Sequence, residues 1–187
     1  MTGFDTARLH LRPIGEGDEA LYCGLYTDPD LMRHIAAPMT LEAAKRSFGA
    51  ACRQQSWMKQ RWILLERSSA VPISIGQLGL FVDADATQGA SAEIGVMLLD
   101  DWQKRGYAAE AIMAMADRVF DAGALALLWT RHAPDNALAT GLMQKLHFQR
   151  GTMDDATPPQ RRWTLPRSQW LQGRARAGVV VTGSVGR

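Results

Sequence analysis

The residues best suited to chemistry lie in one short turn at positions 103–108, which read Gln-Lys-Arg-Gly-Tyr-Ala. The turn separates an apolar segment that ends at Leu99 from a helical pattern that begins near Gly106. The first amides of a helix have no intrahelical partner, and the helix dipole adds positive potential there. Gly106 lets an anion approach the backbone, while Lys104 and Arg105 add charge. The turn therefore predicts a phosphate or pyrophosphate site; the alternative is a plain strand-to-helix turn.

The remaining chemistry-bearing residues do not resemble a metal site. The histidines His10, His34, His132 and His147 are scattered, and no Cys/His cluster has metal-ligand spacing, so we predict no metal. The 187 residues and the hydrophobic content of 47% are typical of one globular domain. No apolar run reaches transmembrane length and no secretory signal is visible, so we expect a cytoplasmic protein without a membrane partner.

The elements that must position the turn follow from the spacing of apolar residues. Helices are expected where these residues recur at three- and four-residue intervals, and strands where they alternate or are β-branched. The expected helices are 18–27, 40–55, 106–122 and 136–146. The expected strands are 7–14, 62–66, 73–82, 92–99, 125–130, 148–153 and 161–165. This order predicts an α/β (α+β) domain over residues 1–172, with a mixed, mostly antiparallel central sheet of about seven strands flanked by about four helices.

Three segments, in this order, resemble motifs of one known family. Residues 6–12 (Thr-Ala-Arg-Leu-His-Leu-Arg) resemble a first strand, and residues 93–96 through 106–111 resemble an acetyl-CoA motif. Asn136-x-x-Ala139 through Lys145-Leu146-x-Phe148 resembles a second cofactor motif. The family is the GNAT superfamily of N-acetyltransferases, and the branch is that of RimJ/RimL-like ribosomal-protein N-terminal acetyltransferases. The resemblance covers about residues 6–171 in element order.

The resemblance implies an acetyl-CoA-dependent N-acetyltransferase. The acetyl group would pass to a primary amine, on a protein N-terminus or a small molecule, by direct attack on the thioester. The backbone of residues 97–99 would pair with the pantetheine arm, the 103–108 turn would hold the pyrophosphate, and Asn136 would bond near the pantetheine. The cofactor-binding residues are then Met97, Leu98, Leu99, Gln103, Lys104, Arg105, Gly106, Tyr107, Ala108 and Asn136.

The chain departs from the family pattern at three positions of the second cofactor motif. Met143 stands where many members carry a tyrosine that protonates the departing thiolate. Ala139 replaces a common serine, and His147 replaces the glycine before Phe148. The usual general acid is therefore absent from its position in the motif.

An amine must lose a proton before it attacks, because free alkyl amines are mostly protonated near neutral pH. Glu93 is the first candidate base, since the resemblance places it on the strand beside the thioester; the alternative is an ion pair in the sheet. A backbone N–H near Met97 would stabilise the negative charge that develops on the carbonyl oxygen. Glu110, Tyr107 and His132 have structural explanations, namely helix-dipole stabilisation, packing and a strand-end hydrogen bond.

Two loops are expected to select the acceptor amine, 28–40 and 153–160. Their carboxylates Asp28, Asp30, Asp154 and Asp155 would attract a cation, although loop acids are usually only solvated. The sequence leaves open whether the protein is a monomer or a homodimer.

The charge is unevenly distributed. Residues 1–160 contain 15 basic and 19 acidic residues, a net charge of −4, whereas six arginines and no acid follow Asp155. We expect residues 173–187 to form a basic, poorly ordered tail, and we do not expect nucleic acid to be the partner. Two alternatives remain: a non-catalytic acyl-CoA-binding or regulatory module, and a ribosome- or RNA-associated protein that uses the tail.

Overall fold

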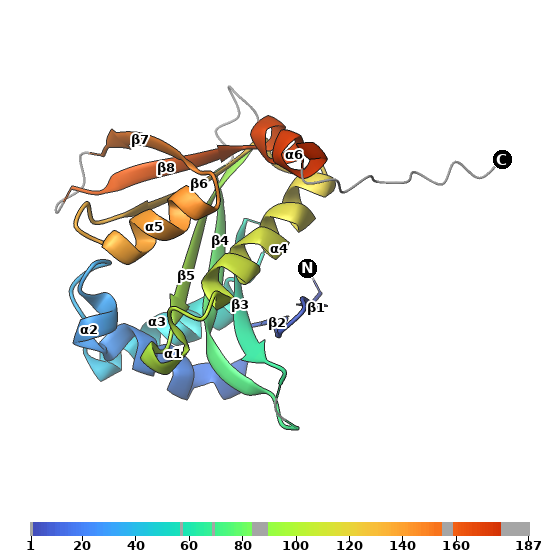
Figure 1. Ribbon diagram of the computed structural model, residues 1–187. Helices are drawn as coiled ribbons and strands as arrows, with labels where there is room; N and C mark the ends of the chain where they lie inside the picture. Colours follow the sequence, from blue (N-terminus) through green and yellow to red (C-terminus); the bar gives the residue numbers. More distant parts are fainter. Residues whose placement is uncertain (1, 57, 69, 84–89, 155–158, 177–187) are drawn as a thin grey trace.

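Within the described residues, eight strands pair into one sheet, in the order β1-β2-β3-β4-β5-β6-β8-β7 (Figure 1). The computed structural model describes residues 2–56, 58–68, 70–83, 90–154 and 159–176. The strands are β1 (Phe4–Asp5), β2 (Leu9–Pro13), β3 (Lys59–Glu66), β4 (Ile73–Asp83), β5 (Ser91–Leu98), β6 (Leu127–His132), β7 (Gln149–Met153) and β8 (Arg161–Pro166). Every neighbouring pair is antiparallel except β5 and β6, which are parallel.

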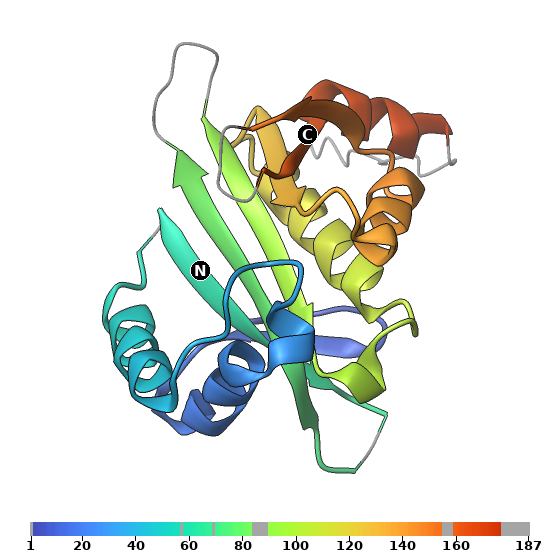
Figure 2. The ribbon, with the colours of Figure 1, turned by 90° about the vertical axis from the view of Figure 1, so that its left-hand side faces the viewer.

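In the part of the chain that the structure describes, six α-helices lie against the two faces of the sheet (Figure 2). They are α1 (Glu19–Thr27), α2 (Pro29–Met32), α3 (Leu41–Arg53), α4 (Tyr107–Asp121), α5 (Ala137–Lys145) and α6 (Arg167–Arg176). Figure 2 shows α1 and α3 on one side of the strands β3, β4 and β5, with α4 on the other side. The chain therefore forms a layered arrangement of helices and sheet.

The main core lies between α4 and the sheet. Ala111, Ile112, Met115 and Val119 form one stripe of α4 and are buried against strand residues such as Leu78. Burying a side chain of this size stabilises the fold by about 1.5–3 kcal/mol. A second, smaller cluster forms beneath α1 and α3 around Tyr22, Phe48 and Ile63.

The predicted fold class is confirmed, and the described residues add β1, α2 and α6 to the expected strands and α-helices. The two-residue strand β1 pairs Phe4 with Leu11, and α2 is a single turn that Asp28 caps by accepting from the amides of Asp30 and Leu31. Helix α6 was not predicted, and it extends past the expected domain limit at residue 172 to Arg176. Arg174 on α6 bonds to Asp117 and Asp121 of α4 at 3.0 and 2.9 Å. The remainder of the expected tail, 177–187, lies outside the described residues.

Crossing a lipid bilayer requires a long helix of apolar residues. Among the described helices, none is both long and apolar enough to do so.

Candidate functional site

Strands β5 and β6 separate soon after they begin to pair. Their parallel pairing covers only Ser91, Ala92 and Glu93 of β5, whereas β5 pairs with β4 as far as Leu98. From residue 94 to 98, the edge of β5 that faces β6 therefore has no strand partner. An unpaired edge inside a sheet can accept an extended ligand as an added strand.

Three hydrogen bonds indicate which backbone groups lie along this open edge. Ala90 O accepts from Ala126 N, on the β6 side, at 2.8 Å, and Leu98 O accepts from Gln103 Nε2 at 3.1 Å. Leu99 N, in contrast, donates to Ile75 O, on the β4 side, at 3.0 Å. Because the direction of backbone groups alternates along a strand, even-numbered residues face the opening and odd-numbered residues face β4. The open-edge groups belong to Ile94, Val96 and Leu98, and those of Met97 point toward β4.

The 103–108 turn lies next to the end of this strand and has an unusual backbone. Lys104 and Gly106 both have positive φ, 59° and 86°. Gly106 caps α4 without a side-chain hydrogen bond, and the first helical bond runs from Glu110 N to Gly106 O at 3.1 Å. Within the described residues, the amides of 104–109 donate no hydrogen bond. Free amides at a helix N-terminus fit a phosphate group, so this part of the structure suits a pyrophosphate.

Arg8 and Glu110 connect the 103–108 turn and the start of α4 to the segment before β2. The Glu110 carboxylate accepts from Arg8 Nε at 2.7 Å, from Arg8 N at 2.8 Å and from the Thr6 hydroxyl at 2.6 Å. Arg8 Nη1 donates to Arg105 O at 3.0 Å, and the guanidinium carbon lies 4.3 Å from the centre of the Tyr107 ring. Arg8 and Thr6 thereby connect the start of β2 to the first turn of α4. We did not anticipate this connection, although both residues lie in the first matched segment.

Glu110 and Tyr107 have structural roles in this arrangement. Burial of Glu110 opposes its ionisation, but the hydrogen bonds from Thr6 and Arg8 outweigh burial, and its pKa lies below the ordinary value. Tyr107 is buried, and burial together with the Glu66 carboxylate raises the pKa of its hydroxyl. Tyr107 therefore stays protonated and packs, while its backbone amide belongs to the turn.

The face of β4 and β5 opposite α4 is lined by a row of facing residue pairs. Gln77 faces Met97, Gly79 faces Gly95, and Phe81 faces Glu93. The Phe81 ring covers Gly79, whereas a Cβ added to Gly95 would meet no atom within 4 Å. Gly95 thus leaves free space on this face, directly beside the open strand edge.

Glu93 sits at the closed end of the opening, in the last residue pair between β5 and β6. Its carboxylate lies 3.3 Å from Arg131 Nε, and Arg131 Nη1 lies 3.3 Å from Asp154 Oδ2. The side chain is 28% exposed, so part of the carboxylate is open to solvent. The expected ion pair is present, and it leaves part of the carboxylate accessible.

Gln77 is a further polar residue at this face. It is 4% exposed, its Nε2 donates to the Tyr26 hydroxyl at 2.9 Å, and its Oε1 has no partner among the described residues. We missed Gln77 because it lies in a strongly apolar strand, where nothing local marks it. Its position opposite Met97 is visible only from the strand register.

Helix α5 borders the opening from the side of β6. Asn136 caps it, with Oδ1 accepting from Ala139 N at 3.0 Å, so Nδ2 is the group left for a ligand. Met143 is 4% exposed and belongs to the main core. His132 is also buried, stacks on Trp163 and bonds through Nδ1 to Ala133 O, as expected for a strand-end histidine.

The loop acids proposed to attract an amine are partly engaged in the fold. Asp28 caps α2, and Asp154 accepts from Gln160 N at 2.8 Å and pairs with Arg131. Asp30 has no bond to a cation among the described residues, and Asp155 lies outside them. The loop after α2 reaches the other side of the opening, because His34 lies 3.3 Å from Asp135 and Gln160 Nε2 donates to Ile35 O.

Residues 8–149, which include the diverging strands, the 103–108 turn and α5, match the acetyltransferase (GNAT) domain family. The chain belongs to the GNAT acetyltransferase family. Members of this family use acetyl-CoA as the acetyl donor, and the free amides beside an open strand edge fit this cofactor. No curated protein matches the chain in sequence.

Solved structures of other acetyltransferases share this GNAT fold. One from Bacillus anthracis is 16% identical, with a TM-score of 0.76 over 89% of this chain and 99% of its own. Spermidine N-acetyltransferase from Vibrio cholerae, in complex with CoA and spermine, is 17% identical, with a TM-score of 0.74 over 89% and 99%. RimL, a ribosomal L7/L12 alpha-N-protein acetyltransferase in complex with coenzyme A, is 13% identical, with a TM-score of 0.73 over 88% and 97%. At such identities the similarity concerns the fold, and the RimJ/RimL-like branch stays a prediction.

Proposed function

We propose that this GNAT protein is an acetyl-CoA-dependent N-acetyltransferase whose acceptor is a primary amine. The observation that carries the proposal is the position of the open edge of β5 next to the free amides at the start of α4. An extended arm can pair with the strand edge while its pyrophosphate meets the amides, and the accessible carboxylate of Glu93 lies on the same strand.

The proposed cofactor contacts refine those expected from sequence. The amides of 104–109 would hold the pyrophosphate, with Gln103 tying the turn to Leu98 O. Val96 and Leu98 would offer backbone groups to the pantetheine arm in place of Met97, because only even-numbered residues face the opening. Asn136 would contribute Nδ2 from the start of α5.

The residues proposed to act in the reaction lie on β5, with Arg131 of β6 beside them. When bound, acetyl-CoA supplies an activated acetyl group that an amine can attack directly. In this proposal Val96 N–H replaces the N–H of Met97 and would stabilise negative charge on the carbonyl oxygen. Glu93 would accept the proton of the acceptor amine, and Arg131 would hold the Glu93 carboxylate in place. The space over Gly95 would receive the acceptor.

One observation favours the second candidate, a non-catalytic acyl-CoA-binding module. Met143 occupies the position of the usual tyrosine acid, and its thioether has no proton to give to a thiolate; its side chain is buried in the core. Such a module would bind acetyl-CoA and release no coenzyme A in the presence of amines. The third candidate, RNA contact through the tail, depends mostly on residues 177–187, outside the described residues, and stays a prediction.

The deciding experiment measures release of free thiol from acetyl-CoA with a panel of acceptors, beside calorimetric titration of coenzyme A. The panel includes polyamines and peptides with free N-termini, because the similar structures include a spermidine N-acetyltransferase and RimL. Amine-dependent thiol release supports the enzyme, and the best acceptor tests the RimJ/RimL-like branch. Binding of coenzyme A without turnover of any amine would instead support the non-catalytic module.

A further inference from the structure

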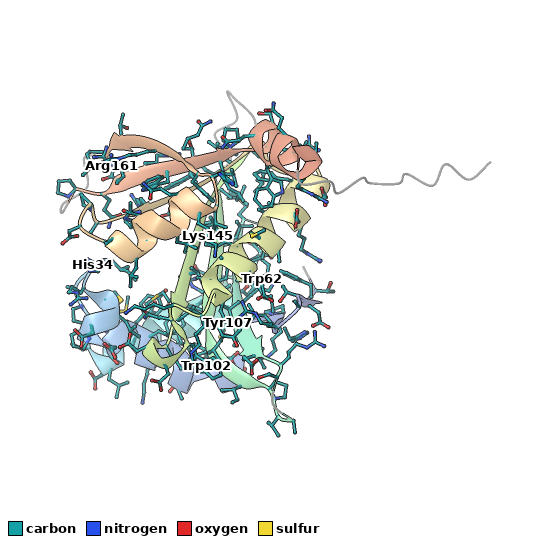
Figure 3. The ribbon with its side chains drawn as sticks, viewed as in Figure 1. His34, Trp62, Trp102, Tyr107, Lys145 and Arg161 are labelled. Carbon is teal, nitrogen blue, oxygen red and sulfur yellow. The ribbon has the colours of Figure 1, made fainter. Side chains whose placement is uncertain are left out.

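Arg61 on β3 points to the face of the sheet that carries the space proposed for the acceptor. The next residue, Trp62, is buried in the core on the α4 side of the sheet (Figure 3). Because side chains alternate along a strand, Arg61 lies on the opposite face. Its guanidinium carbon is 6.0 Å from the centre of the Tyr22 ring on α1 and 5.0 Å from that of Phe81 on β4. Arg61 therefore shares its face with Phe81 and Gly95.

Two glycines separate Arg61 from the open edge of β5. Arg61 pairs with Gly79 of β4, and Gly79 pairs with Gly95 of β5. Neighbouring strands lie about 4.8 Å apart, so Arg61 and Gly95 are about 10 Å apart across the sheet. The Phe81 ring covers Gly79, and Gly95 is exposed with open space where a Cβ would lie. A long arginine side chain can therefore reach over this row toward a ligand above Gly95.

The guanidinium of Arg61 has no hydrogen bond or ion pair in the part of the chain that the structure describes. The residue is half-buried, yet its nitrogen atoms are not among the buried polar atoms that lack a partner, so they are open to solvent. The rings of Tyr22 and Phe81 fix the position of the guanidinium without using its N–H groups. A guanidinium with free donors matches a carboxylate, which can accept two parallel hydrogen bonds from it.

The acids that the sheet places on this face do not neutralise Arg61. Glu93 pairs with Arg131 at 3.3 Å, and Asp83, at the end of β4, has a partner of its own. Lys59 on β3 faces Phe81 and is exposed, which adds a second cation on the same face as Arg61. Within the described residues, neither cation forms an ion pair. A negatively charged group on the ligand would supply the missing partner.

The end of the sheet that carries these side chains is accessible. In Figure 2, α1 and α3 lie over one end of β3, β4 and β5, and no described helix covers the other end on this face, where β4 ends and β5 begins. Phe81 and Glu93 pair with each other at this uncovered end. A ligand can therefore reach Glu93, Gly95 and Arg61 from the same side.

We propose that Arg61 binds a carboxylate of the acceptor, and that the acceptor is therefore an amine with a carboxylate close by. An amino acid and a peptide with an acidic residue near its N-terminus both have this chemistry. The inference rests on the proposed N-acetyltransferase function and narrows its acceptor. The amine would lie above Gly95, beside Glu93, while the guanidinium of Arg61 binds the carboxylate. A polyamine, which carries only positive charge, would be a poor acceptor.

The test compares acceptors that differ only in one carboxylate. The peptide pair is Ala-Glu-Ala-amide and Ala-Gln-Ala-amide, and the small-molecule pair is 4-aminobutyrate and 4-aminobutanamide. Within each pair the two amines have similar basicity, so their chemical reactivity is matched. Thiol release from acetyl-CoA gives kcat/KM, which we expect to be about tenfold or more higher for the carboxylate in at least one pair. The pair with the larger ratio identifies a peptide or a small molecule as the source of the carboxylate.

Variants of two cations on β3 separate a direct contact from a general effect of charge. Arg61→Gln should reduce the ratio to below about twofold, and Arg61→Lys, which keeps the charge but not the paired donors, should retain part of it. Both acceptors are measured on the same sample, so any loss of folded protein cancels from the ratio. The matched control is Lys59→Gln, at an exposed position of the same strand and face, which should leave the ratio unchanged.

Three results would overturn the proposal. They are equal kcat/KM values within both pairs, a carboxylate preference that Arg61→Gln preserves, and equal losses in Arg61→Gln and Lys59→Gln. If no amine is acetylated, calorimetric titration of the same pairs onto the coenzyme A complex measures the carboxylate preference directly, and its absence there also overturns the proposal. Absence of thiol release contradicts the proposed function. Thiol release without a preference that depends on Arg61 contradicts this inference alone.

Discussion

The Glu110 carboxylate accepts the Nε–H of Arg8 at 2.7 Å, which joins the residue before β2 to the first turn of α4. Arg8 also bonds to Arg105 O, so one guanidinium connects the helix start to the turn that would hold the pyrophosphate. The stability of the fold and the shape of the 103–108 turn therefore depend on the same ion pair.

Glu110→Gln should lower the free energy of unfolding at neutral pH by about 1–2 kcal/mol, because the bonds to a charged acceptor are weakened. The folded-state pKa of Glu110 lies below its ordinary value of 4.5. Its contribution is thus fully present above that value and is lost as the pH falls through the lowered folded pKa. Denaturant unfolding between neutral and acidic pH measures this, and the difference between wild type and variant should shrink in acid.

The control is Glu42→Gln, which changes an exposed acid in the first turn of α3 that has no hydrogen bond among the described residues. Both positions interact with a helix dipole, but only Glu110 accepts bonds from Thr6 and Arg8. Equal destabilisation by the two variants would mean that the dipole, not the ion pair, explains the effect.

Gly106→Ala should weaken acetyl-CoA binding at least tenfold, about 1.4 kcal/mol. Gly106 has φ of 86°, and an added Cβ would lie 3.3 Å from Arg8 Nη2, so both the backbone and the Arg8 side chain must shift. Gly123→Ala is the matched control: it lies at the other end of α4 with φ of 66° and open space around a Cβ. Calorimetry should show lost affinity for Gly106→Ala alone, while both variants lose about 1–2 kcal/mol of stability. Unchanged affinity in folded Gly106→Ala would refute the pyrophosphate site.

Gly95→Leu should raise the KM for the acceptor amine at least tenfold, because the new side chain fills the space that we assign to the acceptor. No atom lies within 4 Å of the position that a Cβ would take, so folding should be retained. The affinity for acetyl-CoA should stay unchanged. Gly141→Leu, at an exposed position of α5 with similar free space, serves as control. An unchanged acceptor KM would place the acceptor elsewhere.

Glu93→Gln should lower kcat by about 10²-fold, since the amide cannot accept the proton of the amine. Affinity for acetyl-CoA should be retained. Asp154→Asn removes the other carboxylate from Arg131 and should preserve kcat, which separates a proton acceptor from a partner of the ion-pair network. Near-normal turnover by Glu93→Gln would mean that the amine loses its proton to water and that Glu93 is structural.

Met143→Tyr should destabilise the protein by about 1–3 kcal/mol, because Met143 is 4% exposed and a larger ring overpacks the core. Met113→Tyr, at a position of α4 that is 45% exposed, should destabilise the protein much less.

The pH profile of kcat/KM in the wild type should rise as the amine deprotonates and show no falling limb from an enzyme tyrosine. Such a falling limb would reveal another acid.

Much of the candidate site could be predicted from local sequence. The helix of α4, its buried stripe and the glycine before it all follow from residues within a few turns, and Gly106 proved to have the left-handed backbone that favours glycine. Helix α6 was missed because its residues, Arg167–Arg176, show almost no amphipathic pattern. Its order comes from contacts such as those of Arg174 with α4, which no local pattern signals.

The sequence by itself determined the order of the elements, the apolar faces and the composition of the turn, because these depend on residues near one another in the chain. Alternation also placed Glu93, Gly95 and Met97 on one face of β5. Only the tertiary structure decided that the backbone groups of Val96 and Leu98, not those of Met97, face the opening, because that depends on how β5 is hydrogen-bonded to β4. The tertiary structure likewise decided that Arg8 bonds to the backbone of the turn and that Gln77 lies beside Met97, since these contacts join residues far apart in sequence.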